Sequence, residues 1–271
     1  MLTPIAMQTH AIRESMPTVV VGVTLRASDA SQNKGEKFVK LLDFLNIDPP
    51  APSEVVFCEV GSINKAFVWS WRGKKEEDAY EPFRVYVNSF RSARGRGNQI
   101  FHGYVVERGQ HLENGYLFDQ DIISLRSRDE EGQRVSLVYR GHVCGRTDLV
   151  VMMYAARGTI VRHMVRFAVE VKDAEAMRTK LSSCIREAAT QVIGLCADNS
   201  NNSPSVILTD FTVGFYVLYL AESAMSGEDQ LKFDLIVQKC SNIQSAINKA
   251  LDVSAHCRTR DFCRPTTPEG F

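Results

Sequence analysis

The segment from 90 to 104, FRSARGRGNQIFHGY, concentrates residue types that could bind phosphate. A guanidinium can donate two parallel hydrogen bonds to a phosphate or carboxylate, and glycines such as Gly95 and Gly97 let the backbone approach such a group closely. The pattern matches no complete phosphate-binding motif, and glycines are ordinary in hairpin turns. We interpret the segment as a loop that contacts an anionic partner, with a charged turn as the alternative. Its arginines are Arg91, Arg94 and Arg96.

In the wider stretch from Phe83 to Val171, arginine is present but lysine is absent. It has thirteen arginines, nine acidic residues and no lysine, although the rest of the chain has eleven lysines. The stretch therefore carries a net charge of +4, and the remainder −4, because the formal net charge of the chain is zero. A sheet face with arginines and exposed aromatic side chains can bind single-stranded nucleic acid by charge and stacking. The alternative is that the arginines pair with nearby acids on a solvated sheet face. We predict a nucleic-acid-binding face formed by Arg84, Arg91, Arg94, Arg96, Arg108, Arg162 and Arg166.

Other residue groups could support metal binding or catalysis. Asp119 and Asp121 share one side of an expected strand and could hold a divalent cation, but we interpret them as cross-strand partners of Arg126 or Arg134. His142 and Cys144, with Asp148 nearby, suggest a thiol and its base, although side chains adjacent on one strand face seldom reach attack geometry.

The C-terminal group His256, Cys257 and Cys263 lacks the second ligand pair of a closed zinc site. No nucleophile elbow, phosphate loop or metalloprotease helix is found. We therefore predict no catalytic residue, no metal ligand and no cofactor. The seven cysteines are odd in number and scattered, which predicts unpaired thiols in an intracellular, cytoplasmic protein, with a nuclear location as the alternative.

The elements that would position these residues are mostly strands. A Val/Thr-rich first strand is expected at 18–27, a loop at 28–35 and a short helix at 36–47 that ends at DPPAPS. Alternating apolar residues then predict a hairpin at 54–60 and 65–71 and a strand at 83–90. Further strands are expected around 98–107, 115–125, 133–143, 148–156 and 158–171.

Two helices are expected after residue 171. Asp173 can cap the first, at 174–196, and the polar stretch 197–204 reads as a linker. Residues 205–220 alternate as one buried strand, and Ser226 with Asp229 forms a capping-box pattern before a second helix that carries apolar residues from 231 to 251.

The expected fold class is α+β, with an antiparallel core of eight or nine strands in a sandwich or barrel-like form and helices packed on it. We predict a single domain at 18–253 (β core 18–171, helical part 172–253) between flexible tails at 1–17 and 254–271. No apolar run reaches the length of about 20 residues that spans a bilayer.

We interpret the chain as a non-enzymatic binding protein whose arginine-rich face binds nucleic acid or another polyanion. By analogy of fold alone, small viral structural or transport proteins, movement-like or matrix-like, combine a β core with helical flanks. One alternative is a protein–protein assembly module that forms homo-oligomers through salt-bridged contacts. The other is a hydrolase or transferase whose site is unrecognised.

Overall fold

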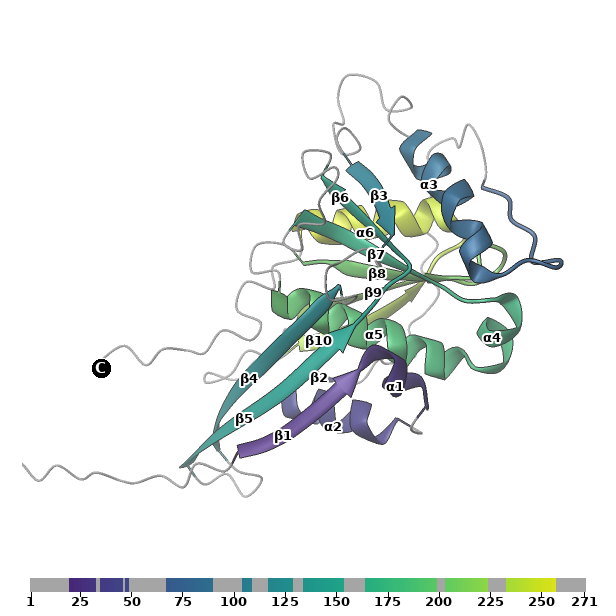
Figure 1. The fold of residues 1–271 in the computed structure, drawn as a ribbon. Coiled ribbons are helices and arrows are strands. Elements are labelled where there is room, and N and C mark those ends of the chain that lie inside the picture. Colours follow the sequence, from purple (N-terminus) through teal and green to yellow (C-terminus); the bar gives the residue numbers. More distant parts are fainter. Residues whose placement is uncertain are drawn as a thin grey trace, which may run out of the picture.

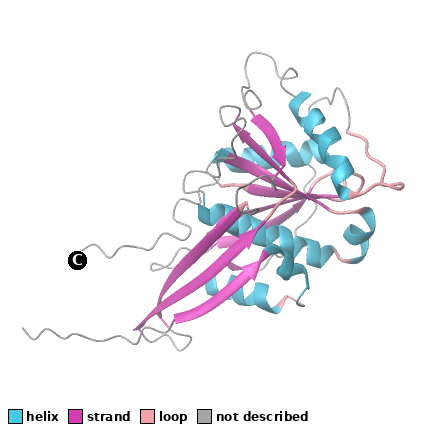
Figure 2. Ribbon diagram, in the orientation of Figure 1, coloured by secondary structure: helices cyan, strands magenta, loops and turns pink. Residues whose placement is uncertain are grey.

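The structure is a computed structural model that describes residues 20–32, 35–45, 47–48, 67–89, 104–108, 117–128, 134–153, 164–198, 203–223 and 233–256. These residues form helices and two mixed sheets, so the fold class is α+β, as predicted (Figure 2).

The larger sheet has seven strands in the described part of the chain. Two neighbouring pairs, β2–β10 and β7–β8, are parallel, and the other four pairs are antiparallel. In spatial order the strands are β2 (Ile47–Asp48), β10 (Phe233–Lys239), β9 (Phe215–Glu222), β8 (Ser205–Thr209), β7 (Val165–Val171), β6 (Leu149–Met153) and β3 (Tyr104–Arg108).

A helical crossover joins the parallel strands β7 and β8, because parallel neighbours cannot be connected by a tight turn. The crossover consists of α4 (Ala174–Thr179) and α5 (Leu181–Asp198). The Asp173 carboxylate accepts a hydrogen bond from the Ala176 N–H at 2.7 Å and caps α4, as predicted.

Helices cover both faces of the larger sheet (Figure 1). Helix α5 contacts β8 and β9 on one face, and α6 (Ile243–His256) contacts β7, β8 and β9 on the other. Successive residues of β8 belong to different clusters: Val206 and Leu208 pack with α5, whereas Ile207 packs in the cluster of α6. This alternation follows from the two-residue period of a strand.

The smaller sheet packs against the same helix α5 and has the order β1–β5–β4. A Cβ added at Gly194 of α5 would lie 2.1 Å from the Phe118 ring of β4, so the helix and strand touch only because residue 194 is glycine. Helix α5 therefore lies between the two sheets. The remaining elements here are β1 (Val20–Arg26), β4 (Phe118–Arg128), β5 (Arg134–Gly145), α1 (Ala27–Gln32) and α2 (Glu36–Leu45).

The strand expected at 83–90 is a helix, α3 (Tyr80–Ser89), which contacts β3. Phe83, Tyr86 and Val87 are buried at helical spacing, whereas Val85 is 58% exposed. The pattern was misread because Val85 continued an apparent alternation, although Tyr86 belongs to the buried face.

Three other expected elements differ from the structure. The single strand expected at 205–220 is the hairpin β8–β9, because Asp210 accepts hydrogen bonds from three backbone N–H groups (residues 212–214) and closes a turn. The helix expected across 231–251 contains strand β10 before α6, and part of the loop expected at 28–35 belongs to α1.

The core is mixed rather than antiparallel, since β1–β5, β2–β10 and β7–β8 are parallel pairs. The number of strands and their sandwich or barrel-like form stay predictions, as do the domain boundaries. Of the expected hairpin at 54–71, only residues 67–71 are described, and these form no strand. No helix among the described residues is long and apolar enough to cross a membrane.

Candidate functional site

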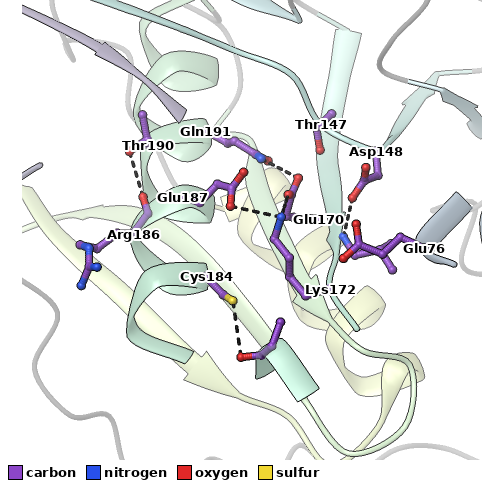
Figure 3. Close-up of polar contacts among 12 residues, drawn as sticks. Glu76, Thr147, Asp148, Glu170, Lys172, Cys184, Arg186, Glu187, Thr190 and Gln191 are labelled. Atoms are coloured by element: carbon purple, nitrogen blue, oxygen red, sulfur yellow. Dashed lines mark hydrogen bonds and ion pairs between the residues drawn. The ribbon is translucent and has the colours of Figure 1, made fainter. Parts of the chain in front are cut away.

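Buried charged side chains gather where β6 begins and β7 ends (Figure 3). Asp148, the residue before β6, accepts hydrogen bonds from the Tyr80 hydroxyl and, at 2.7 Å, from the Val171 N–H. Burial raises the pKa of Asp148 well above its usual range, and the charge of Glu170 adds to this effect. Burial and the neighbouring Asp148 also raise the pKa of Tyr80. The pair therefore links α3 to the sheet through a shared hydrogen bond.

Lys172, which directly follows β7, lies between two carboxylates. Its Nζ lies 2.5 Å from Glu170 Oε1 and 3.1 Å from Glu187 Oε2 of α5. The three side chains are 17%, 6% and 16% exposed, respectively, so the ion pairs are largely removed from water. Gln191, one turn after Glu187, donates to Glu170 Oε2 at 2.6 Å. This network fixes α5 to the end of β7.

The network contains several carboxyl groups but only one cation, Lys172, and this imbalance affects the pKa values of its members. Burial raises the pKa of Glu187 to about 7, the charge of Glu170 adds to the rise, and Lys172 opposes it. Burial alone would lower the pKa of Lys172, but Glu170 and Glu187 raise it overall, so the ammonium stays charged. Burial likewise raises the pKa of Glu76, whose carboxylate accepts a hydrogen bond from the Asp173 N–H at 3.2 Å.

The elements that carry the network come from distant parts of the sequence. Glu76 lies in η1 (Glu76–Ala79), Tyr80 begins α3, and Glu187 lies on α5. The chemistry of this arrangement is that of a buried ion-pair network that joins these elements. Within the described ranges, no group of three or more His, Cys, Asp or Glu side chains could hold a metal ion. The contacts join η1, α3, β7 and α5, and we call the seven residues that make them the Lys172 network: Glu76, Tyr80, Asp148, Glu170, Lys172, Glu187 and Gln191.

The seven arginines predicted to form a binding face are only partly described. Arg84 is on the exposed side of α3, not on a strand, and its Nε donates to Glu81 Oε2 at 2.7 Å. Arg166 on β7 is half-buried, with Nη1 3.5 Å from the Ser254 hydroxyl of α6. Arg108 is the last residue of β3, where only the backbone is described. Four positions lie outside the described residues: Arg91, Arg94, Arg96 and Arg162.

Asp119 and Asp121 lie on β4, but the expected arginine partners are not opposite them. Their Cα partners on β5 are Cys144 and His142. Arg126 lies on the same strand as the acids, and Arg134 pairs with Arg128. The predicted cross-strand pairing was therefore wrong.

The cysteines agree with the prediction as far as they are described. Four are buried thiols that form no disulfide, and Cys144 is 5% exposed on β5, two residues after half-buried His142. His256 ends α6, whereas Cys257 and Cys263 lie outside the described residues. The described cysteines outside any disulfide are Cys144, Cys184, Cys196 and Cys240.

Sequence reasoning missed the Lys172 network apart from Asp148, which it had grouped with His142 and Cys144. One signal was present: Glu170 is a lone acid in the apolar strand FAVEV and is followed two residues later by Lys172. A buried acid of this kind needs a cation or several donors. The partners on α5 and η1 could not be found in the same way, because they are joined by the fold and not by sequence spacing.

No protein-family model matches this chain, and no curated protein matches it either.

Proposed function

We propose that this chain is a non-enzymatic intracellular binding protein that binds nucleic acid, or another polyanion, through arginines at one end of the larger sheet. Single-stranded RNA or DNA is the proposed ligand, because arginines can both pair with phosphates and stack on bases. A viral structural or transport role, movement-like or matrix-like, would suit such a protein by analogy of fold alone.

The observation that carries the proposal is where the arginine-bearing segments are attached. Residues 90–103 enter β3 at Tyr104, and residues 154–163 leave β6 at Met153, and these two residues are Cα partners. Val165 of β7 pairs with Met152 beside them. Figure 1 shows the end of α3, the start of β3 and the end of β6 on the same side of the molecule.

Five arginines of the two segments follow or precede these attachment points. Arg91 comes two residues after Ser89, and Arg162 comes three residues before Val165. Both are therefore close in sequence to described residues of α3 and β7. The five are Arg91, Arg94, Arg96, Arg157 and Arg162. The two arginines whose side chains are described, Arg84 and Arg166, contribute less to the proposal, because each contacts a neighbour in the fold.

The decisive experiment replaces Arg91, Arg94 and Arg96 together by alanine. If they contact phosphates, the slope of log affinity against log salt should fall by about two units for a single strand and somewhat more for a duplex. The matched control removes the same charge from three exposed arginines outside the arginine-only stretch: Arg26, Arg72 and Arg178.

Fluorescence anisotropy with a labelled oligonucleotide at several salt concentrations measures both slopes. A lysine triple variant should bind with intermediate affinity, because charge is kept but forked and stacked contacts are lost. If the alanine triple binds as tightly as wild type with an unchanged slope, or if the control triple weakens binding equally, the segment does not bind phosphate.

A further inference from the structure

The Lys172 network contains four carboxyl groups for one ammonium group. The carboxyl groups lie around Lys172 (Figure 3) and belong to Glu76, Asp148, Glu170 and Glu187. If all four were ionised, four negative charges would face one positive charge. Burial and neighbouring like charges both disfavour the ionised form of a carboxyl group. A cluster of this composition is therefore more stable when it binds a proton.

Glu187 of α5 is well placed to bind that proton. From the end of β7 it is faced by Glu170 and Lys172. Glu76 faces it from η1, and the Cys184 thiol lies near it on its own helix. Burial and Glu170 raise the pKa of Glu187 to about 7. The group therefore changes charge near neutral pH, and its ionised form repels both Glu170 and Glu76.

Gln191 gives a second reason to place the proton at this position. Its Nε2 donates to Glu170 Oε2 at 2.6 Å, whereas its Oε1 is buried without a hydrogen-bond partner among the described residues. A buried acceptor without a donor is costly. Gln191 lies four residues after Glu187 on α5, so the two side chains share one face of the helix. A protonated Glu187 adds an O–H donor to this face, which an ionised carboxylate lacks.

The acids of the network differ in how firmly they are held. Glu170 is almost fully buried and accepts hydrogen bonds at 2.5 and 2.6 Å, and Asp148 accepts two hydrogen bonds. Glu76 is half-buried, begins the four-residue helix η1 and follows the exposed residues 72–75. Its hydrogen bond from the Asp173 N–H is longer, at 3.2 Å. Glu76 is therefore the acid that moves away from a new negative charge at the least cost.

We propose that η1 and the first two residues of α3, residues 76–81, form a pH-controlled latch. The latch is held against the sheet while the Lys172 network binds a proton, and it is released when that proton is lost. Release breaks the contact of Glu76 with the Asp173 N–H and the contact of Tyr80 with Asp148. The proton acts as a ligand that binds the closed state more tightly than the open state.

The sign of the pH dependence follows from Glu187. Release removes the charge of Glu76 and admits water, so the pKa of Glu187 falls from about 7 toward its ordinary value of 4.5. The closed state therefore binds more protons between these values, and the latch opens as the pH rises through about 7. Lys172 stays charged and Tyr80 stays neutral in this range, because the pKa of each is raised. For one proton, the opening constant should rise about five- to tenfold between pH 6 and 8.

This inference is independent of the proposed polyanion binding. The network lies where β6 begins and β7 ends, whereas the arginine-bearing segments are attached where β6 ends and β7 begins. The latch is measured without nucleic acid, so either proposal can fail without the other.

Hydrogen exchange of the full chain at pH 6, 7 and 8 tests the latch, after correction for the pH dependence of the chemical exchange rate. The reporters are the amides of residues 78–84, and the reference is β8, whose five residues are all buried. Amides of β8 report unfolding of the whole chain. The reporters should open at least about tenfold more often than β8, with the rise given above. Reporters that open only as often as β8 at each pH, or equally at pH 6 and 8, would overturn the proposal.

Three substitutions identify the groups that act. Glu187→Gln cannot ionise, so the opening constant of residues 78–84 should change less than about twofold between pH 6 and 8. Glu76→Gln keeps an acceptor for the Asp173 N–H but removes the repelled charge, so the change should be about threefold or less. The matched control is Glu77→Gln, an exposed acid of the same short helix, which should behave like wild type. A Glu76→Gln chain that keeps the full wild-type change would exclude the latch.

Discussion

The Lys172 network and strand β4 both contain acidic and basic residues, but the fold treats their charges differently. Around Lys172, two carboxylates approach the ammonium within 3.1 Å, and the side chains come from β7 and α5, which pack in the core. Along β4, the strand register with β5 opposes acids with Cys144 and His142, and one arginine with another.

The difference indicates that the charges around Lys172 are paired within the fold, whereas the strand register alone provides no such pairing for the charges of β4. Charges that are buried need counter-charges within the same chain, because an unpaired buried ion is costly. The register of β4 with β5 places no residue of opposite formal charge directly across from its four charged residues, so no comparable pairing within the sheet follows for them.

The largest effect should follow from removing the cation of the buried network. Lys172→Met leaves Glu170 and Glu187 without their counter-charge, and breaking a buried ion pair in this way costs about 3–5 kcal/mol of unfolding free energy. Urea denaturation measures the loss. The control Lys180→Met, at an exposed position, should change stability by less than about 0.5 kcal/mol.

A triple variant sharpens this result. If Lys172→Met is combined with Glu170→Leu and Glu187→Leu, much of the lost stability should return, because no uncompensated charge remains. Polyanion binding by the folded fraction should be unchanged in both variants. A loss below about 1 kcal/mol for Lys172→Met would show that the network contributes little to the fold.

The second effect is smaller and depends on pH. The pKa of Glu187 is about 7 in the folded chain and near its ordinary value of 4.5 when unfolded. Between these values the folded state binds more protons, so stability should fall as the pH rises from about 5 to 8. The loss attributable to Glu187 is about 2 kcal/mol. Thermal or urea denaturation across this range measures it.

The variant Glu187→Gln should reduce the dependence of the unfolding free energy on pH, because a neutral side chain then faces Glu170, Lys172 and Glu76. Part of the slope should remain, since the pKa of buried Asp148 is also raised. Glu175→Gln, an exposed acid on α4, is the matched control and should leave the profile as in wild type. An unchanged profile for Glu187→Gln would assign the titration to another group.

Much of the framework could be predicted because its signals are local. The strand β1, the helix α2, the cap at Asp173 and the strands β4 to β7 follow from periodicity and capping within a few residues. The errors occurred where packing decides between two readings of one pattern. Residues 83–90 alternate like a strand, yet Phe83, Tyr86 and Val87 pack as one helix face.

The Lys172 network shows why a site is harder to predict than an element. Tyr80 and Asp148 are separated by 68 residues, and Glu170 and Gln191 by 21, so no spacing rule connects them. The arginine-only stretch was visible as composition, but composition did not place Arg84 on a helix beside Glu81. Strand register, which decides what lies opposite Asp119 and Asp121, is likewise set by the fold.

The smallest expected effect is that of replacing Arg84. For this residue, the ion pair within the fold and the proposed contact with a polyanion can be measured separately. Its guanidinium donates to Glu81 on the exposed side of α3, where solvent screens the pair, so the pair contributes little to stability. Arg84→Ala should therefore leave the midpoint of urea denaturation close to that of wild type. If Arg84 belongs to the polyanion-binding face, the same variant should reduce the salt slope of oligonucleotide binding by somewhat less than one unit. Arg178→Ala, an exposed arginine on α4, should change neither quantity. If Arg84→Ala instead lowers stability markedly and leaves the salt slope unchanged, Arg84 has a structural role, as the Lys172 network does. It would then not belong to the polyanion-binding face.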